Sequence, residues 1–345
     1  MPNCLQINAL QNSSPELKLV DSHASPDTNT IHATYEGLKP DISVYRRECP
    51  RTRPTDFSLM EFYCEAKFDP LDDPFGDITT LERKTNAAKD TKGQITSYAV
   101  AQRSTQFRTH IFSILLFPKF ARLIRWDQAG AVVTKGFPLE HLVDFVKRYN
   151  DASPLERGVD DTVSTPSEEL AEIARKELGL PSSQRMIQFN LPASADISAA
   201  QYIGAEPVYK PNSSPTGRAT CAFIVYDVQR AKLVFLKDTW RIDLPSIEKE
   251  GDIYRHLHQC GVSHIAPLVR AEDITHQRTL TQDYADESGK QPFERKFRPH
   301  QHYLLILDVV AQKLFTFRSA WELVIVMRDA LIGILSEASP KHLLT

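Results

Sequence analysis

The sequence predicts two folded domains, an α/β domain followed by an α+β domain. Its 345 residues are enough for two ordinary domains, and 41% hydrophobic with 25% charged residues is the composition of a globular protein. Between residues 35 and 150, short segments rich in β-branched and aromatic residues alternate with amphipathic segments. After residue 200, the segments follow in the order strand, strand, helix, strand, strand.

Residues 1–34 are rich in Asn, Ser, Asp and Pro and show little hydrophobic periodicity, so we expect a disordered leader there. The α/β domain follows at residues 35–150. β-branched and aromatic content predicts five strands, and the spacing of apolar residues predicts two helices packed on the sheet. The expected strands are 39–45, 59–68, 108–117, 121–128 and 130–137, and the expected helices are 92–107 and 139–151.

Residues 151–200 resemble a connector, because loop-forming residues surround a single helical segment, SEELAEIARKEL. Thr165 is a plausible N-cap for this helix, with Pro166 at its first position. The α+β domain then occupies residues 201–345, with a charged insertion at 275–301. Its expected strands are 220–228, 232–240, 264–273 and 302–310, and its expected helices are 247–261, closed by Gly261, and 319–335.

Charge and cysteine content exclude several classes of protein. A net charge of -3 and a pI near 6.4 argue against coating nucleic acid by charge alone, so nucleic acid could bind only at a specific site. The five cysteines show no metal-binding spacing and no disulfide framework, which fits a reducing compartment. The longest apolar runs are shorter than the roughly 20 residues of a membrane helix. We expect a cytoplasmic or nuclear protein that does not enter a membrane.

Lys237 and Glu250 form the most informative pair in the second domain. Lys237 lies on an expected strand, and Glu250 lies thirteen positions later near the start of an expected helix. A strand lysine held by a helix carboxylate can neutralise the phosphates of a bound nucleotide. Glu248 and Asp252 are lesser candidates for the carboxylate. A plain alternative is that the lysine and the glutamate are both solvated surface residues.

Several motifs in this region resemble the fungal-type protein kinase family. They are GRAT at 217–220, FLKDTWR at 235–241, EGDIYRHL at 250–257 and LFTFRSAWELVIVMRDAL at 314–331, and RLIRWDQAGAVVTKGF at 122–137 resembles the segment before the kinase lobe. The resemblance covers about residues 35–335. It implies a protein-kinase-like small lobe, ATP with Mg²⁺ as cofactors, and phosphoryl transfer to a Ser or Thr hydroxyl of a protein substrate.

The resemblance also assigns roles to single residues. Lys237 would bind the phosphates, Glu250 would hold Lys237, and the segment around Gly217 and Arg218 would cover the phosphates. The residues from Leu307 would form the hinge, whose backbone could bind adenine. A single glycine in TGRAT departs from the G-x-G-x-x-G pattern, so the backbone there has less freedom to approach the phosphates closely.

The sequence departs from the family after the last predicted helix. Neither H-R-D-x-x-x-x-N nor D-F-G occurs in the 345 residues, so the large lobe is expected to be incomplete. We therefore expect this polypeptide to be inactive as a kinase, as a truncated chain or a pseudokinase would be. The apolar residues of the last helix would then be left exposed, which favours a protein partner. They are Trp321, Leu323, Val324 and Leu331.

A second constellation lies in the first domain. Asp41 lies on one expected strand, Glu65 and Lys67 lie on the next, and Gln94 begins the pattern Gln94-x-x-x-Tyr98 on a helix. These residues resemble the core of the restriction-endonuclease-like nuclease superfamily. The resemblance implies a nuclease-like fold in which Asp41 and Glu65 share a Mg²⁺ and Lys67 stabilises the attacking hydroxide or the phosphate. The alternatives are a nucleic-acid-binding domain without cleavage, or solvent-facing residues at a strand edge.

Overall fold

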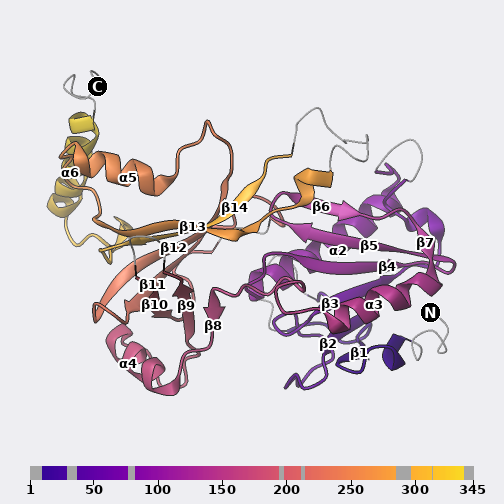
Figure 1. Cartoon of the computed structure of the whole chain (residues 1–345). Helices are drawn as coiled ribbons and strands as arrows, with labels where there is room; N and C mark the ends of the chain where they lie inside the picture. Colours follow the sequence, from indigo (N-terminus) through magenta and orange to yellow (C-terminus); the bar gives the residue numbers. More distant parts are fainter. Residues whose placement is uncertain are drawn as a thin grey trace. The chain divides into compact units, whose positions relative to one another are not determined.

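The computed structural model describes residues 10–28, 37–76, 82–193, 198–210, 214–284, 297–312 and 314–337. It is a mixed α and β structure with two sheets, and the chain divides into two compact units (Figure 1). Unit 1 consists of Met1–Asp161, Asn212–Gly217 and Arg278–His300. Unit 2 consists of Thr162–Pro211, Arg218–Gln277 and Gln301–Thr345.

The sheet of unit 1 is mixed. Its strands run in the order β1-β2-β3-β4-β5-β6, with β7 paired to β5. The pairs β1–β2 and β2–β3 are antiparallel, whereas β3 and β4 are parallel and are joined through α2. The bounds are β1 (Leu17–Asp21), β2 (Ile42–Arg46), β3 (Phe62–Ala66), α2 (Asn86–Thr105), β4 (Ile111–Leu116), β5 (Phe120–Asp127), β6 (Gly130–Val133) and β7 (Phe137–Pro138), with the 3-10 turns η1 (Pro70–Asp72) and η2 (Leu139–His141).

Helices α2 and α3 (Leu142–Asp151) cover opposite faces of this sheet, because successive side chains of a strand point to opposite sides. Tyr63 packs in one core with Ile95 and Tyr98 of α2. Its neighbour Phe62 packs in the other core with Tyr149 of α3. Glu65 and Lys67 have the same parity as Tyr63, so they face α2.

The expected disordered leader at residues 1–34 is wrong for Leu17–Asp21, which form β1 along β2. Leu17 is fully buried and Leu10 also joins the core beside α3. The sequence pattern did not predict β1 because the residues around it are polar. The strand forms because it pairs with β2 in the tertiary structure. Residues 1–9 and 29–36 of the expected leader lie outside the described residues.

The sheet of unit 2 has the order β13-β14-β12-β11-β10-β9-β8. Residues expected to be a connector supply β8, β9 and the start of β10, so this segment is part of the second fold rather than a spacer. The bounds are β8 (Val163–Ser164), β9 (Ile187–Leu191), β10 (Ala200–Gly204), β11 (Cys221–Asp227), β12 (Lys232–Ile242), β13 (Leu268–Arg278) and β14 (His300–Leu307).

Helix α4 (Glu168–Leu178) begins after Ser167, whose hydroxyl accepts a hydrogen bond from the backbone of Leu170, so the expected N-cap at Thr165 is two residues early. It packs on the sheet through Ala171 and Ala174. The other helices of this unit are α5 (Glu250–Gln259) and α6 (Ala320–Glu337), with the 3-10 turn η4 (Leu314–Thr316); a further turn, η3 (Thr281–Tyr284), belongs to unit 1.

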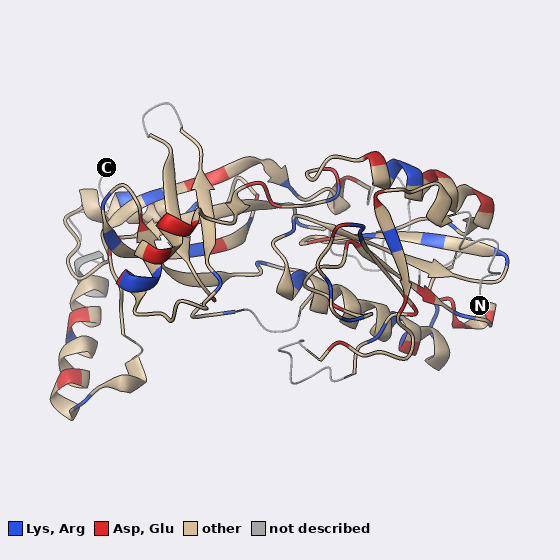
Figure 2. Ribbon diagram, turned by 90° about the horizontal axis from the view of Figure 1, so that it is seen from below, with Lys and Arg blue, Asp and Glu red and all other residues tan. Residues whose placement is uncertain are grey.

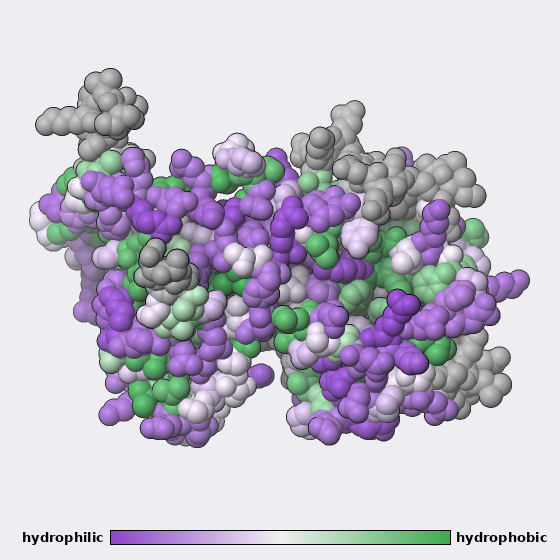
Figure 3. All heavy atoms as spheres, in the orientation of Figure 1, coloured by the Kyte–Doolittle hydropathy of each residue, from purple (hydrophilic) through white to green (hydrophobic). Residues whose placement is uncertain are grey.

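The surface is polar, with α6 as an exception. Lys and Arg residues are interspersed with Asp and Glu residues in both units (Figure 2). On the face shown in Figure 3, hydrophobic residues occur in small groups among hydrophilic ones. On α6, Trp321 is 72% exposed, and Val324 and Leu331 are each 56% exposed, whereas Leu323 is half-buried. None of the helices in the described ranges is long and apolar enough to span a membrane.

Candidate functional site

Lys237 and Glu250 are joined by an ion pair in unit 2. Lys237 extends from the middle of β12, and Glu250 is the first residue of α5. The Nζ atom of Lys237 donates a hydrogen bond of 2.6 Å to Oε2 of Glu250. The two side chains are 22% and 30% exposed, so the pair is partly shielded but open to a ligand. The lesser candidates lie elsewhere, because Glu248 is exposed and Asp252 pairs with Arg255.

The start of α5 lies close against the sheet. The backbone N–H of Gly251 donates a hydrogen bond of 2.8 Å to the hydroxyl of Tyr303 on β14. Tyr254 packs against the core cluster of Tyr303, Leu305 and Leu307, but Ile253 is 40% exposed, so of Ile253 and Tyr254 it is Tyr254 that faces the sheet. The position of Glu250 is therefore set by a helix start that is anchored at its backbone.

Gly217 and Arg218 do not join Lys237 among the described contacts. Gly217 has φ +104 and its backbone N–H bonds to the carbonyl of Gln128, within unit 1. The carbonyl of Arg218 accepts from Trp240, and its side chain is exposed. Of the four residues expected to bind ATP, the structure thus brings together Lys237 and Glu250.

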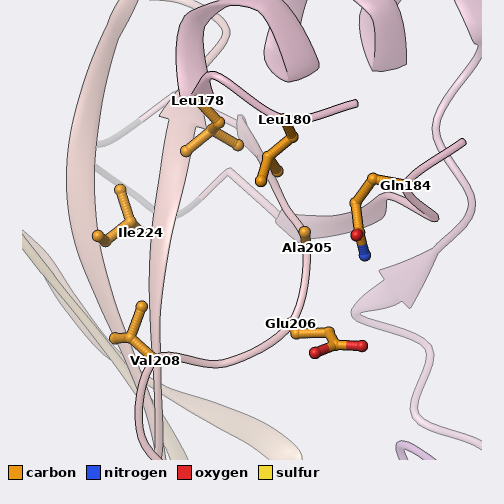
Figure 4. A pocket seen from close by; sticks show the side chains of 7 residues that line it. All are labelled: Leu178, Leu180, Gln184, Ala205, Glu206, Val208 and Ile224. Atoms are coloured by element: carbon orange, nitrogen blue, oxygen red, sulfur yellow. The ribbon is translucent and has the colours of Figure 1, made fainter. Parts of the chain in front are cut away.

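An apolar pocket lies on the same face of the sheet as Lys237. Directly opposite residues of an antiparallel pair share a face, and Ala222 is opposite Lys237 while Ile224 is opposite Phe235. Ile224 lines a cavity of about 240 Å³. In Figure 4, leucine, valine and isoleucine side chains surround this space, and Gln184 and Glu206 supply polar groups on one side. The lining residues are Leu178, Leu180, Gln184, Ala205, Glu206, Val208 and Ile224.

The expected hinge begins at Leu307, the last residue of β14. Asp308 accepts from Arg230 at 2.5 Å and from Lys232 at 2.6 Å, and these two cations hold the pKa of its carboxyl below the ordinary value, Lys232 having the larger effect. Its backbone N–H bonds to the carbonyl of Pro267. The segment is thus tied to the turn between β11 and β12.

A second cluster lies in unit 1 at the end of β3. Lys67 donates hydrogen bonds of 2.8 Å to Oε1 of Glu65 and 2.7 Å to Oε1 of Gln94 on α2. Asp41, just before β2, accepts the backbone N–H of Ala66 at 2.8 Å. The structure therefore brings together all four residues, which the sequence placed on two strands and a helix. They meet because β2 and β3 are adjacent and α2 covers this face.

The carboxylate of Glu65 is only partly satisfied. Its side chain is 3% exposed, and Oε2 has no hydrogen-bond partner among the described residues. Burial and, to a smaller degree, the nearby Asp41 carboxylate raise the pKa of Glu65 despite the Lys67 contact. A buried carboxylate oxygen without a partner costs free energy unless a cation or a proton meets it.

Two carboxylates are a small protein ligand set for a metal. Within the described ranges, no cluster contains three or more His, Cys, Asp or Glu side chains suited to a metal ion. Mg²⁺ commonly binds one or two carboxylates and completes its shell with water and substrate oxygens. Asp41 and Glu65 fit that donor set.

Two features of these sites were not predicted from sequence. Tyr98 bridges Gln94 to the chain, accepting from its Nε2 and donating to the carbonyl of Lys39, both at 2.8 Å. Its place four residues after Gln94, on the same helix face, was the available signal. Nothing in the sequence indicated the pocket beside Ile224, because residues far apart in the chain form its walls.

Comparison with known proteins gives one match. The model of a family described as fungal protein kinase matches residues 77–341, more than half of the chain. No significant match was found among curated proteins or among solved structures.

Proposed function

The chain belongs to the fungal protein kinase family, and we propose that unit 2 binds an adenine nucleotide through Lys237 and Glu250. The observation that carries the proposal is the 2.6 Å ion pair between these side chains. A strand lysine held by a helix glutamate presents its ammonium to the phosphates of a nucleotide. The order β11, β12, α5, β13, β14 supports the same reading, because it is the order of a kinase small lobe.

The two ends of the nucleotide would meet different surfaces. The phosphates would lie at Lys237, whose positive charge offsets theirs. The base would enter the pocket beside Ile224, which lies about 7 Å along the strand from the Lys237 row. A cavity of about 240 Å³ is below the usual size for a whole small ligand and suits one ring system. Glu206 and Gln184 could accept and donate hydrogen bonds at the base edge.

Mg²⁺ bound with the nucleotide would supply charge neutralisation at the phosphates. Lys237 would compensate the charge of the phosphates, and Glu250 would orient Lys237. A transferable phosphoryl group and a protein hydroxyl acceptor are what the family implies for the complete reaction.

Nucleotide-induced stabilisation tests this proposal. ADP should raise the unfolding temperature of the wild-type chain, because a ligand that binds only the folded state stabilises it. Lys237→Met should abolish most of that rise. Lys232→Met is the matched control, since it also breaks an ion pair on β12, with Asp308, but on the other face of the strand. An ADP effect that survives Lys237→Met unchanged would remove Lys237 from the site.

A second candidate function is favoured by the Glu65 cluster. We propose that unit 1 binds a divalent metal at Asp41 and Glu65 and acts as a metal-dependent nuclease. The supporting observation is the buried Oε2 of Glu65, near Asp41 and Lys67, for which the described part of the chain supplies no hydrogen-bond partner. Asp41 and Glu65 would hold the metal, whose chemistry when bound is water activation; Lys67 would stabilise the attacked phosphate, and Gln94 would hold Lys67 in place.

Cleavage assays separate the two candidates. The chain should cleave a nucleic acid with Mg²⁺ or Mn²⁺, and Glu65→Ala should remove that activity while Lys237→Met keeps it. Absence of any cleavage that depends on both the metal and Glu65 would end the nuclease proposal. Metal binding without cleavage, detected as Mn²⁺-induced stabilisation lost in Glu65→Ala, would leave a nucleic-acid-binding or remnant site.

A further inference from the structure

We infer that Asp273 and Tyr303 are positioning residues that set Glu250 against Lys237 by clamping the first turn of α5. The inference rests on the proposed nucleotide site for its functional meaning, but the clamp concerns contacts within unit 2 alone. The three residues at the start of the helix, Lys249, Glu250 and Gly251, each contact a different strand.

The first contact holds the residue before Glu250. The Nζ atom of Lys249 lies 2.8 Å from Asp273 on β13. Arg241 on β12 also binds Asp273, with Nε at 2.6 Å and Nη2 at 2.8 Å. Burial raises the pKa of Asp273, but the hydrogen bonds from Arg241 and Lys249 outweigh it and lower that pKa. Asp273 is therefore a charged anchor with two cationic partners.

The second contact holds the residue after Glu250. The N-cap residue of α5, Lys249, makes no side-chain capping hydrogen bond, so the first turn lacks the usual local cap. Tyr303, which is 1% exposed, accepts the N–H of Gly251 instead. A Cβ atom at Gly251 would lie 2.3 Å from Cβ of Ala271 and 2.6 Å from the Tyr303 hydroxyl. Glycine is required for this close approach.

Glu250 lies between these two anchors, so its backbone cannot shift without breaking one of them. A strand lysine paired with a movable carboxylate would lose its partner part of the time. Here Asp273 from β13 and Tyr303 from β14 fix the helix start, and the carboxylate meets Lys237 on β12 at 2.6 Å. The clamp thus prepares the pair before any ligand binds.

The test measures the Lys237 ion pair without a nucleotide, so it does not depend on whether the chain binds one. Lysine acylation by acetic anhydride requires the free amine, and a lysine held by a carboxylate reacts more slowly. The rate at Lys237 is followed by mass spectrometry in the intact chain. Glu250→Gln should raise it by about 1.5- to 5-fold, the ratio expected for a partly exposed ion pair.

Tyr303→Phe and Asp273→Asn should each raise the Lys237 rate in the same direction. Neither should raise it further when combined with Glu250→Gln, because both act through that carboxylate. Asp308→Asn is the matched control, since it frees Lys232 on the same strand and should leave Lys237 unchanged.

Two results would overturn the inference. One is an unchanged Lys237 rate in both Tyr303→Phe and Asp273→Asn. The other is an increase that persists in the Glu250→Gln background, which would show general loosening of the sheet. If the wild-type chain does not bind ADP, the nucleotide proposal is wrong, and the result for the clamp still stands.

Discussion

Ile224 on β11 lies directly opposite Phe235 on β12. Phe235 is two residues before Lys237, so the side chains of Ile224, Phe235 and Lys237 lie on the same face of the sheet. This relationship places the apolar pocket and the Lys237–Glu250 pair on one surface of the sheet. A nucleotide could therefore meet an apolar wall with its base and a lysine with its phosphates. Neither feature alone would favour a nucleotide over another anionic or apolar ligand.

Filling the pocket should weaken binding of the base but not of the phosphates. Val208→Trp places a large side chain at the pocket, and we expect about a 10-fold loss in ADP affinity with little change for pyrophosphate. Ile173→Trp is the control, because Ile173 is about as exposed, at 40% against 44%, and does not line the cavity. Calorimetric titration of each ligand checks this. Unchanged ADP affinity in Val208→Trp would place the base elsewhere.

Gly251→Ala should destabilise unit 2. The added methyl group would approach Ala271 and Tyr303 too closely, and overpacking of this kind costs about 1–3 kcal/mol. Gly93→Ala is the matched control, because Gly93 lies in α2 with nothing within 4 Å of its Cβ position. That change should stabilise by about 0.5–1 kcal/mol through helix propensity. Urea unfolding measures both, and equal effects would contradict the close approach of α5.

Glu65→Gln should change the pH dependence of stability. The folded-state pKa of Glu65 is raised above its ordinary value of 4.5. Its contribution to the free energy of unfolding is therefore fully present below about pH 4.5 and is lost as pH rises through the folded-state pKa. The glutamine variant cannot ionise, so it should gain stability relative to wild type between pH 4 and pH 7.

Urea unfolding of both proteins at the two pH values checks this prediction. Glu140→Gln, which removes a charge from an exposed side chain, serves as the control for net charge. A stability difference that is the same at both pH values would show that Glu65 is satisfied by Lys67 alone.

The exposed side chains of α6 should contribute little to folding. Trp321→Ser and Leu331→Ser should change the free energy of unfolding by no more than about 0.5 kcal/mol, as is usual for exposed positions. They should reduce binding of a hydrophobic fluorescent dye. We propose that this face meets a protein partner, since an apolar surface of this kind favours association. A large loss of stability would show instead that α6 packs in a core.

Local patterns predicted most of the regular elements. The β-branched runs at β2 to β5 and the apolar stripe of α3 depend on residues near in sequence, and the structure has strands and a helix there. β1, β9 and β10 were missed because their short segments stand among polar and loop-forming residues. They are strands because β1 pairs with β2, β9 pairs with β10, and β10 pairs with β11.

The sites divide in the same way. Lys237 and Glu250, like Glu65 and Lys67, were recognised because side-chain chemistry and spacing along the chain are visible in sequence. The burial of Glu65 Oε2, the pocket at Ile224 and the Tyr303 contact to Gly251 depend on how distant segments pack. Gly217 was expected near Lys237 from its position in the sequence. In the structure its backbone N–H instead donates to the carbonyl of Gln128, which the sequence pattern did not indicate.

The most direct test of the nucleotide site is the acylation rate of Lys237 in the wild-type chain with and without saturating ADP. ADP should slow the reaction at Lys237 and leave Lys232 unchanged, and adenosine should protect neither, because the phosphates are what cover the ammonium. If Lys237 reacts at the same rate with ADP as without it, the phosphates do not bind there and the proposed role of the Lys237–Glu250 pair is wrong.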